Sequence, residues 1–311
     1  MFGFIAIKAA RALATLIICV TAVFVVLRLA GDPADMLLPD DTPAEIKAEY
    51  RIRWGLEGSI PEQYWRYMAA LSRGDLGISF ADGRPAFTVV MEAVPNTFLL
   101  GICAILLALL IGFPAGIIAA LRHNRLADRL LMAFAVIGFS VPSFFFAILL
   151  ILTFSLTLRW LPAAGTETVW HMILPTLALS AGLIGKLARY TRTAMLDVLG
   201  QPYMRTAKAK GVGHLMAMLR HALPNAAAPI LMFLGIEIGL ILTGAAVVET
   251  IFGWPGLGRL LVSSAAARDL PVVQGVILLV ALVIVLSNLA VDILHAMLDP
   301  RLDLFDREKR A

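Results

Sequence analysis

The amino-acid sequence predicts an all-α membrane protein with six transmembrane helices, and two observations support this fold class. Hydrophobic residues make up 60% of the 311 residues, charged residues only 15%, and the mean hydropathy is +0.86. These values are typical of polytopic membrane proteins and lie outside the range of soluble domains. In addition, six apolar runs are long enough to cross about 30 Å of hydrocarbon. They cover residues 12–30, 97–121, 130–157, 172–190, 226–249 and 273–297.

Residues 1–30 comprise the N-terminus and the first predicted span. Lys8 and Arg11 precede a long apolar run, an order that is also found in signal peptides. Cleavage would require small residues at positions where Arg28 and Asp32 stand. We therefore expect this run to remain as a membrane helix.

The distribution of Lys and Arg predicts that both termini are cytoplasmic. Sixteen of these residues fall in segments that an inside N-terminus would place in the cytoplasm. The two short loops on the other side hold only Arg159, Arg259 and Arg268. This asymmetry follows the positive-inside rule.

Residues 31–96 form the predicted extracytoplasmic loop, which the sequence indicates to be helical. Thr42-Pro43-Ala44-Glu45 has the pattern of a capping box before a helix that Gly55 ends. Ser59 to Glu62 repeats the pattern before a helix that Gly74 ends. The segment is either a small cap packed on the bundle or a substrate-binding domain. Helices this short bury little surface, which favours the cap.

Residues 97–311 form the predicted core membrane domain, and three of its spans carry helix-breaking residues. These are Gly112-Phe113-Pro114 with Gly116, Ser140-Val141-Pro142-Ser143, and Leu174-Pro175. Such residues are common in membrane helices, and they also permit kinks that transporters use as hinges. Ser140 and Pro142 are therefore candidate residues of a translocation pathway.

Glu237 is a third candidate for that pathway, because ionisable residues inside a membrane are often functional. It lies near the middle of the fifth span, between Gly235 and Gly239. Either it faces an internal cavity, or it is a protonated or hydrogen-bonded glutamate at a helix contact. Three further residues near span ends have expected structural or interfacial roles, namely Glu249, Asp292 and His295. Lys186 and Arg189 are expected to extend to the cytoplasmic surface.

Residues 199–225 form a long polar segment between apolar runs, and its sequence predicts two short helices. Pro202 suits the first turn of the first helix, and Gly211 suits the position just past its end. Pro224 is expected to end the second helix. The second helix carries an apolar patch of Leu215, Met216, Met218 and Leu219. The segment is either a loop that only enforces topology or a docking element.

After the fifth span, the sequence predicts a tight turn at the outer surface. Gly253, Pro255, Gly256 and Gly258 are its turn formers. Phe252 and Trp254 are expected to anchor it at the membrane interface.

Several short motifs in a fixed order resemble a known family. The run AKAKG at 207–211, followed by Leu223-Pro224, is similar to the signature loop of ABC importer permeases. This loop departs from the family pattern at Arg205, Thr206 and His221. Further matches occur along the chain, at Gly74-Asp75-Leu76-Gly77, Ser79, Glu249, Phe252, Trp254-Pro255-Gly256-Leu257-Gly258, Arg268-Asp269, Asn288, Asp292 and Asp299-Pro300-Arg301. Together they resemble the first, B-type permease of dipeptide, oligopeptide and nickel importers.

This resemblance implies a type I ABC importer permease in the inner membrane. Its partners would be a second homologous permease, two cytoplasmic ATPases that hold ATP and Mg, and an extracytoplasmic solute-binding protein. The 199–225 segment would be the coupling loop to the ATPases. Its implied contact residues are Arg205, Thr206, Ala207, Lys208, Gly211, His214, Leu215, Leu223 and Pro224. The implied cargo is a di- or oligopeptide, with nickel or glutathione as the alternative.

The sequence lacks the motifs of an enzyme or a nucleic-acid-binding protein. We find no phosphate-binding glycine loop, no HExxH or GxSxG motif and no metal-ligand cluster. Cys19 and Cys103 lie in apolar runs, and the basic residues are spread over short loops. We therefore expect no catalytic residue, metal or cofactor in this chain. The rival classes are a secondary transporter or channel and, less favoured, an intramembrane enzyme. The sequence shows neither the paired intramembrane carboxylates nor the inverted repeat that would support a secondary transporter.

Overall fold

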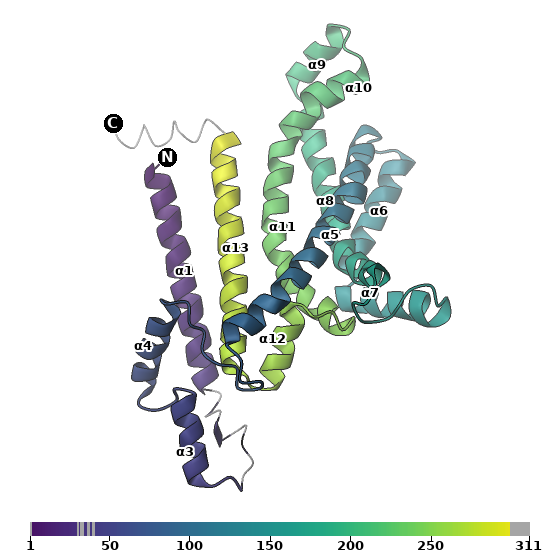
Figure 1. Cartoon of the computed structure of the whole chain (residues 1–311). Coiled ribbons are helices and arrows are strands. Elements are labelled where there is room, and N and C mark those ends of the chain that lie inside the picture. Colours follow the sequence, from purple (N-terminus) through teal and green to yellow (C-terminus); the bar gives the residue numbers. More distant parts are fainter. Residues whose placement is uncertain (1, 30, 32–33, 36–37, 39–40, 299–311) are drawn as a thin grey trace.

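The computed structural model describes residues 2–298, except for residues 30, 32–33, 36–37 and 39–40. In this part of the chain the regular secondary structure is helical, apart from one isolated β-bridge between Ile78 and Pro85. The motif at 299–301 and the tail that follows lie outside the described residues. The helices α1 (Phe2–Leu29), α5 (Ala86–Leu121), α8 (Ile173–Leu199), α11 (Leu223–Ile251) and α13 (Leu270–Leu298) have membrane-spanning length (Figure 1). The predicted all-α membrane fold is confirmed.

The third predicted span, 130–157, is not one straight helix. It consists of α6 (Leu126–Ser140), α7 (Ser143–Leu150) and a π-helical turn, η1 (Ile151–Thr157), that continues α7. The chain bends by 100° between α6 and the helix formed by α7 and η1. The break falls at Val141, whose ψ of 122° is extended. A residue before proline is pushed out of the helical region, and Pro142 is the N-cap residue of α7. Counted as one broken span, α6 and α7 complete the six.

The other two motifs, for which a kink and an ordinary membrane helix were both open, do not break a helix. Pro114 lies inside the continuous helix α5, and Pro175 lies in the first turn of α8. The glycines beside Pro114 instead permit close packing, because a Cβ on Gly112 would lie 2.7 Å from the Ile184 carbonyl oxygen. A Cβ on Gly116 would lie 2.5 Å from the Ala188 carbonyl oxygen. Small residues at this spacing let two membrane helices approach each other.

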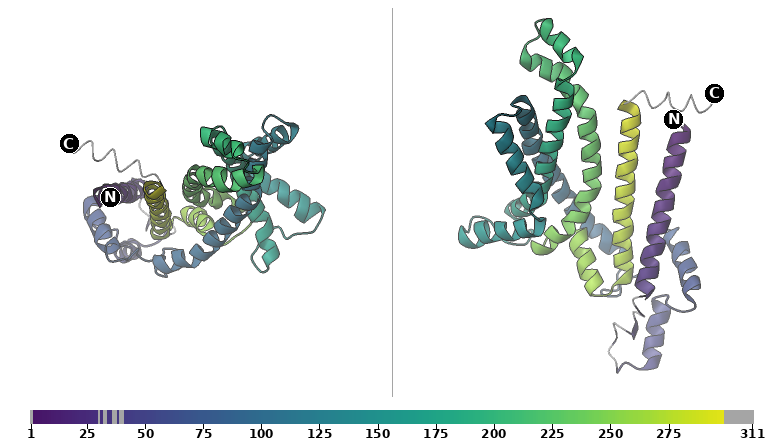
Figure 2. Two further views of the ribbon diagram at one scale, coloured as in Figure 1. Left: turned by 90° about the horizontal axis from the view of Figure 1, so that it is seen from above. Right: turned by 180° about the vertical axis from the view of Figure 1, so that it is seen from behind.

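The membrane helices form a core of α5, α6, α8 and α11, with α13 and α1 on one side of it. Both views in Figure 2 place α1 beside α13, and Lys8 of α1 forms an ion pair of 2.7 Å with Asp292 of α13. The ends of α1 and α13 that bear the chain termini lie at the same end of the bundle as the 199–225 segment (Figure 1). This matches the even number of crossings that the sequence predicts.

Two short helices, α3 (Ala44–Arg53) and α4 (Ile60–Leu71), lie at the opposite end. The predicted capping box at Thr42 is wrong: Pro43 is the N-cap residue and α3 has no side-chain cap. The box at Ser59 is present, and its backbone N–H donates a 2.8 Å hydrogen bond to Glu62, which lowers the pKa of that carboxyl. Helix α4 packs on Phe24 of α1 through Tyr64 and Tyr67. This is the geometry of a small cap.

Helix α5 begins at Ala86, eleven residues before the predicted start of the second span. The loop before it is fixed by Asp269, a buried carboxylate between α12 (Leu257–Ala266) and α13. Asp269 accepts hydrogen bonds from the Ser79 hydroxyl and, at 3.0 Å, from the Phe80 backbone N–H. Two motifs of the resemblance, 190 residues apart, thus meet in space.

The turn after α11 is tight, as predicted, and Gly253 has a positive φ of 63°. The expected interfacial positions of Phe252 and Trp254 are wrong. Both side chains are buried in the core, and the Trp254 indole donates a 3.0 Å hydrogen bond to the Asn96 carbonyl. Glu249, expected to be structural or interfacial, lies buried beneath the same turn.

Candidate translocation cavity and coupling segment

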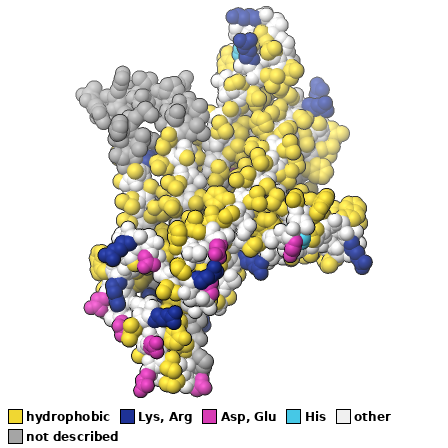
Figure 3. All heavy atoms as spheres, in the orientation of Figure 1, with side chains coloured by type: hydrophobic (Ala, Val, Ile, Leu, Met, Phe, Trp, Pro, Cys, Tyr) yellow, Lys and Arg dark blue, Asp and Glu magenta, His cyan; other side chains and the backbone are white. Residues whose placement is uncertain are grey.

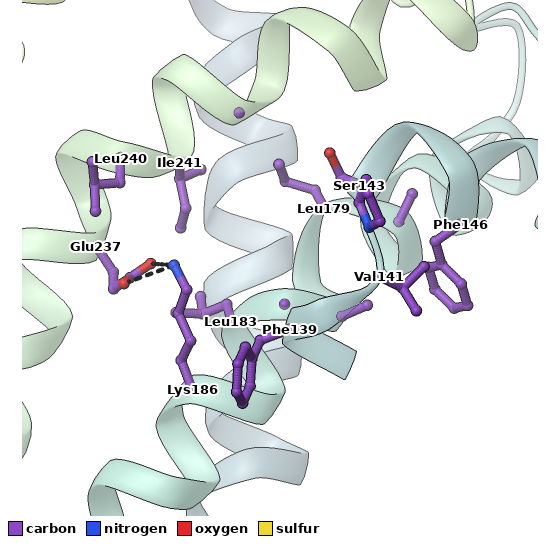
Figure 4. Close-up of a pocket in the computed structure, with 15 residues that line it drawn as sticks. Phe139, Val141, Ser143, Phe146, Leu179, Leu183, Lys186, Glu237, Leu240 and Ile241 are labelled. Atoms are coloured by element: carbon purple, nitrogen blue, oxygen red, sulfur yellow. Dashed lines mark hydrogen bonds and ion pairs between the residues drawn. The ribbon is translucent and has the colours of Figure 1, made fainter. Parts of the chain in front are cut away.

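A cavity of about 240 Å³ lies where the break between α6 and α7 faces α8 and α11 (Figure 4). Its walls are mainly apolar, including Phe139, Phe146, Leu183 and Ile241. The polar groups that line it come from Ser143, Lys186 and Glu237. Helices that are interrupted near the middle of a membrane are common around transport sites.

Lys186 of α8 and Glu237 of α11 form an ion pair in this cavity. The Lys186 Nζ donates hydrogen bonds of 3.0 and 3.1 Å to the two carboxylate oxygens of Glu237 (Figure 4). The Glu237 side chain is 9% exposed, whereas that of Lys186 is 41% exposed. Of the two alternatives for Glu237, the structure therefore has it both lining a cavity and hydrogen-bonded across a helix contact.

The expectation that Lys186 extends to the cytoplasmic surface is wrong. Charged residues inside a membrane pair with one another, and a carboxylate in the neighbouring helix is the nearest partner. The sequence could not show this, because 51 residues separate the two. In the predicted span 172–190, Lys186 lies near one end, and only the observed length of α8 places it in the middle of its helix, as Glu237 is in α11.

The two other candidate pathway residues differ in position. Pro142, the N-cap residue of α7 at the break, lines the cavity. Ser140 is exposed at the last position of α6 and is not among the lining residues. Ser143, which the sequence did not single out as a pathway residue, lines the cavity instead.

The predicted coupling segment stands beyond the ends of α8 and α11 (Figure 1). It contains α9 (Pro202–Ala209), α10 (His214–Ala217) and a π-helical turn, η3 (Met218–Ala222). Pro202 begins α9 as predicted, and Gly211 follows it with a φ of 78°, a conformation that suits glycine. Pro224 does not end the second helix. It lies at the start of α11, directly after the π-helical turn η3, and the helical backbone runs through it without interruption.

The side chains of this segment divide into an inner and an outer face. Met204, Ala207 and Ala222 are buried against the bundle, and Leu223 packs on the same core. The outer face exposes Arg205, Thr206, Tyr203, Gly211 and Pro224. The side chains of Lys208 and His214 lie outside the described residues.

The apolar patch of the second helix is mostly exposed. Leu215 is 65% exposed, Met216 is 55% exposed, and only Met218 of the four is buried. Figure 3 shows hydrophobic side chains over the middle of the molecule, with charged ones mostly over α3 and α4 and at the tip formed by α9 and α10. Exposed apolar side chains beside basic ones, on a segment that stands outside the bundle, are typical of a protein interaction site.

These features define a class: a polytopic helical membrane protein in which two helices that line a cavity continue into a projecting segment with an exposed apolar patch. Among the residues that the structure describes, no three His, Cys, Asp or Glu side chains gather as potential metal ligands.

The chain belongs to the family of binding-protein-dependent transport system inner membrane components, whose model matches residues 112–304. It is thus a multi-pass inner-membrane permease subunit of an ABC importer, as the resemblance to dipeptide, oligopeptide and nickel importer permeases predicted. The family consists of transport components, not enzymes, and such permeases act with ATPase and solute-binding subunits.

Two relatives and one solved structure illustrate the similarity. The chain is 43% identical over 272 residues to the glutathione transport system permease protein GsiC of Escherichia coli O6:H1, covering 88% of this chain and 89% of that protein. It is 42% identical over 287 residues to GsiC of Salmonella paratyphi A, covering 92% and 94%. The inward-facing MetNI methionine ABC transporter has the same fold, with a TM-score of 0.55 at 17% identity, covering 67% of this chain and 95% of that one.

Proposed function

We propose that this chain is the permease subunit of an ATP-driven importer of peptide-type solutes, coupled to its ATPases through the 199–225 segment. One observation carries the proposal. Helices α8 and α11 line the cavity with Lys186 and Glu237, and the same two helices continue into α9, α10 and η3. A force on the projecting segment would therefore act directly on the two helices that hold the charged pair.

The mechanism follows from this continuity. Movement of the ATPases on ATP binding would push the segment, whose inner face is packed on the bundle through Met204 and Ala222. Because packed helices move as rigid bodies, α8 and α11 would shift against α7, and the cavity would open alternately to the two sides. In this proposal ATP and Mg reside in two partner ATPases, and a second homologous permease completes the path. An extracytoplasmic binding protein would deliver the solute.

Peptide-type cargo is supported by the relatives and by the charges in the cavity. The relatives are named as glutathione transport permeases, and glutathione is itself a short peptide. The cavity offers one ammonium and one carboxylate, which suit the charged groups of a peptide. Nickel is less favoured, because the other charged group of the cavity, Lys186, is a cation that repels a metal ion and offers it no lone pair.

The coupling proposal is tested with Leu215→Glu, which puts a charge on the exposed apolar patch. We expect this variant to lose most of the ATPase that co-purifies in mild detergent, and most ATP-dependent peptide uptake in proteoliposomes. A desolvated hot-spot contact of this kind contributes about 2 kcal/mol or more, or roughly thirtyfold in affinity.

The matched control is Ile52→Glu, an equally exposed apolar residue of α3 at the opposite end of the molecule. It should retain the ATPases. Equal recovery of ATPase with both variants would contradict the docking role of the segment. A wild-type chain that purifies without any ATPase would contradict the proposed function as a whole.

A further inference from the structure

We propose that the Lys186–Glu237 pair recognises solutes that carry an ammonium and a carboxylate on the same carbon atom, that is, an amino-acid head group. This inference rests on the proposed function and names the solute class within it. Such a head group occurs at the end of a γ-glutamyl peptide, whereas an ordinary α-linked peptide has its two terminal charges at opposite ends.

The first argument is hydrogen-bonding capacity. Lys186 has three N–H donors, and a carboxylate such as Glu237 has about four lone-pair sites. Among the described residues, the hydrogen bonds recorded for these two groups are the ones they make to each other. Both groups can therefore accept a further charged partner without the pair separating.

The second argument is spacing. The two charges of the pair lie 3.0 Å apart, measured from the Lys186 Nζ to the nearer Glu237 oxygen. Bond lengths of about 1.5 Å within a head group hold its nitrogen and carboxylate oxygens at a similar spacing, roughly 3 Å. Solute and protein can then form a closed ring of four alternating charges. In an extended α-peptide the terminal charges are separated by about 3.3–3.6 Å for every residue, which is too far for one pair to bind both.

The third argument is charge balance. The walls around the pair are mainly apolar, including Leu183, Leu240 and Ile241. A solute with a single charge would leave a net charge in these surroundings, which is costly unless it is compensated. A head group carries both charges and leaves the cavity neutral.

The fourth argument is size. The cavity of about 240 Å³ is smaller than the roughly 300–1,000 Å³ of pockets that enclose a whole drug-sized ligand. It can therefore hold the head group of a peptide, while the remainder extends out of it. Lys186 is the more exposed partner, so the solute carboxylate would make the first contact.

The test compares two isomers of one tripeptide, γ-Glu-Cys-Gly and α-Glu-Cys-Gly, with their thiols methylated. They contain the same atoms, but only the γ isomer has an amino-acid head group. The assembled complex is reconstituted as wild type and with Lys186→Met, Glu237→Gln or both. The neutral double variant leaves no unpaired charge and so protects the fold. The matched control is Lys47→Met, which removes a lysine near Asp35 on the external helix α3.

Two readouts are taken: the ratio of initial uptake rates for the γ and α isomers, and equilibrium binding of each isomer to the purified complex without the binding protein. The preference of the binding protein cancels when variants are compared with wild type. We expect wild type to favour the γ isomer. The double variant should lower this preference about tenfold in both readouts, roughly the size of one charged hydrogen bond, and Lys47→Met should leave it unchanged.

An unchanged preference in the double variant would overturn the inference and leave the pair as a helix contact. A wild-type complex that imports α-linked peptides but not the γ isomer would also overturn it, while the proposed function stands. A wild-type complex that imports no peptide at all would overturn both.

Discussion

Two buried glutamates of α11 have different surroundings, and this separates a structural carboxylate from a candidate solute-binding one. Glu249 is 0% exposed and accepts hydrogen bonds from the Thr97 hydroxyl at 2.6 Å and from the Gly258 and Arg259 backbone N–H groups at 2.7 and 3.1 Å. Two of these hydrogen bonds come from residues just past the turn between α11 and α12, and they hold that turn in place. Glu237 faces a cavity and a single ammonium group.

Glu249→Ala is predicted to destabilise the chain by about 2–4 kcal/mol, because it leaves buried donors of α5 and α12 without their acceptor. The measurement is the apparent melting temperature of the detergent-purified protein, followed by size-exclusion chromatography. Glu45→Ala, at an exposed glutamate of α3, is the control and should change stability by no more than about 0.5 kcal/mol. Equal melting temperatures for the two variants would contradict the structural role of Glu249.

At the scale of single residues, the sequence predicted local backbone roles better than long-range partners. Pro202 and Gly211 lie where their conformational preferences place them, because those preferences act within a few residues. The partner of Glu237 and the burial of Trp254 depend on which helices pack together. The residues within a few positions of Glu237 or Trp254 do not indicate which helix will pack against them.

At the scale of elements, three helix-breaking motifs were visible in the sequence, and one of them breaks its helix. The break at Val141-Pro142 opens onto the cavity, while Pro114 stays inside the continuous helix α5 and Pro175 lies in the first turn of α8. Neighbouring membrane helices can satisfy the backbone groups that a proline frees, so proline alone does not decide where a helix ends. The helices and their order were therefore predictable, but the bend of 100° was not.

Gly116→Ala is predicted to weaken the packing of α5 on α8. The added Cβ would lie 2.5 Å from the Ala188 carbonyl oxygen and 2.6 Å from the Thr191 Cβ, so the helices must separate. Overpacking of this kind costs about 1–3 kcal/mol. Gly101→Ala on the same helix is the control, because its Cβ would meet the Ile241 side chain at an ordinary 3.5 Å. A lower melting temperature for Gly116→Ala alone is expected; two equal values would argue against close packing at Gly116.

At the scale of the whole molecule, the two ends of the bundle differ in character. The end with α9 and α10 carries the projecting segment and the α5–α6 connection, and the other end carries the α3–α4 cap (Figure 1). The family match begins at residue 112, so α1 and the cap precede the shared core. Helix α1 packs on α13, and the cap in turn packs on α1. The N-terminal part is thus added to the outside of the core.

We predict that the α3–α4 end of this bundle is external and the α9–α10 end cytoplasmic, and labelling of single cysteines tests this orientation. In a background with Cys19→Ala and Cys103→Ala, Glu57→Cys lies in the cap and Arg125→Cys lies in the α5–α6 connection, both exposed. A membrane-impermeant maleimide should label Glu57→Cys in intact spheroplasts and Arg125→Cys only after permeabilisation, as the positive-inside rule requires. The reverse pattern would mean that both termini are external.

The burial of α8 has a consequence for how the chain is made. It is the least apolar of the five membrane-length helices, and half of its most apolar stretch is buried in the bundle. The carboxylate partner of Lys186 lies 51 residues downstream, so a ribosome adding about 5–20 residues per second supplies it roughly 3–10 s later. During that interval α5 and α6 are the neighbours that can shield α8 from lipid. Because α5 and α6 precede α8 in the chain, the least apolar membrane helix is synthesised after two of the helices that it packs on.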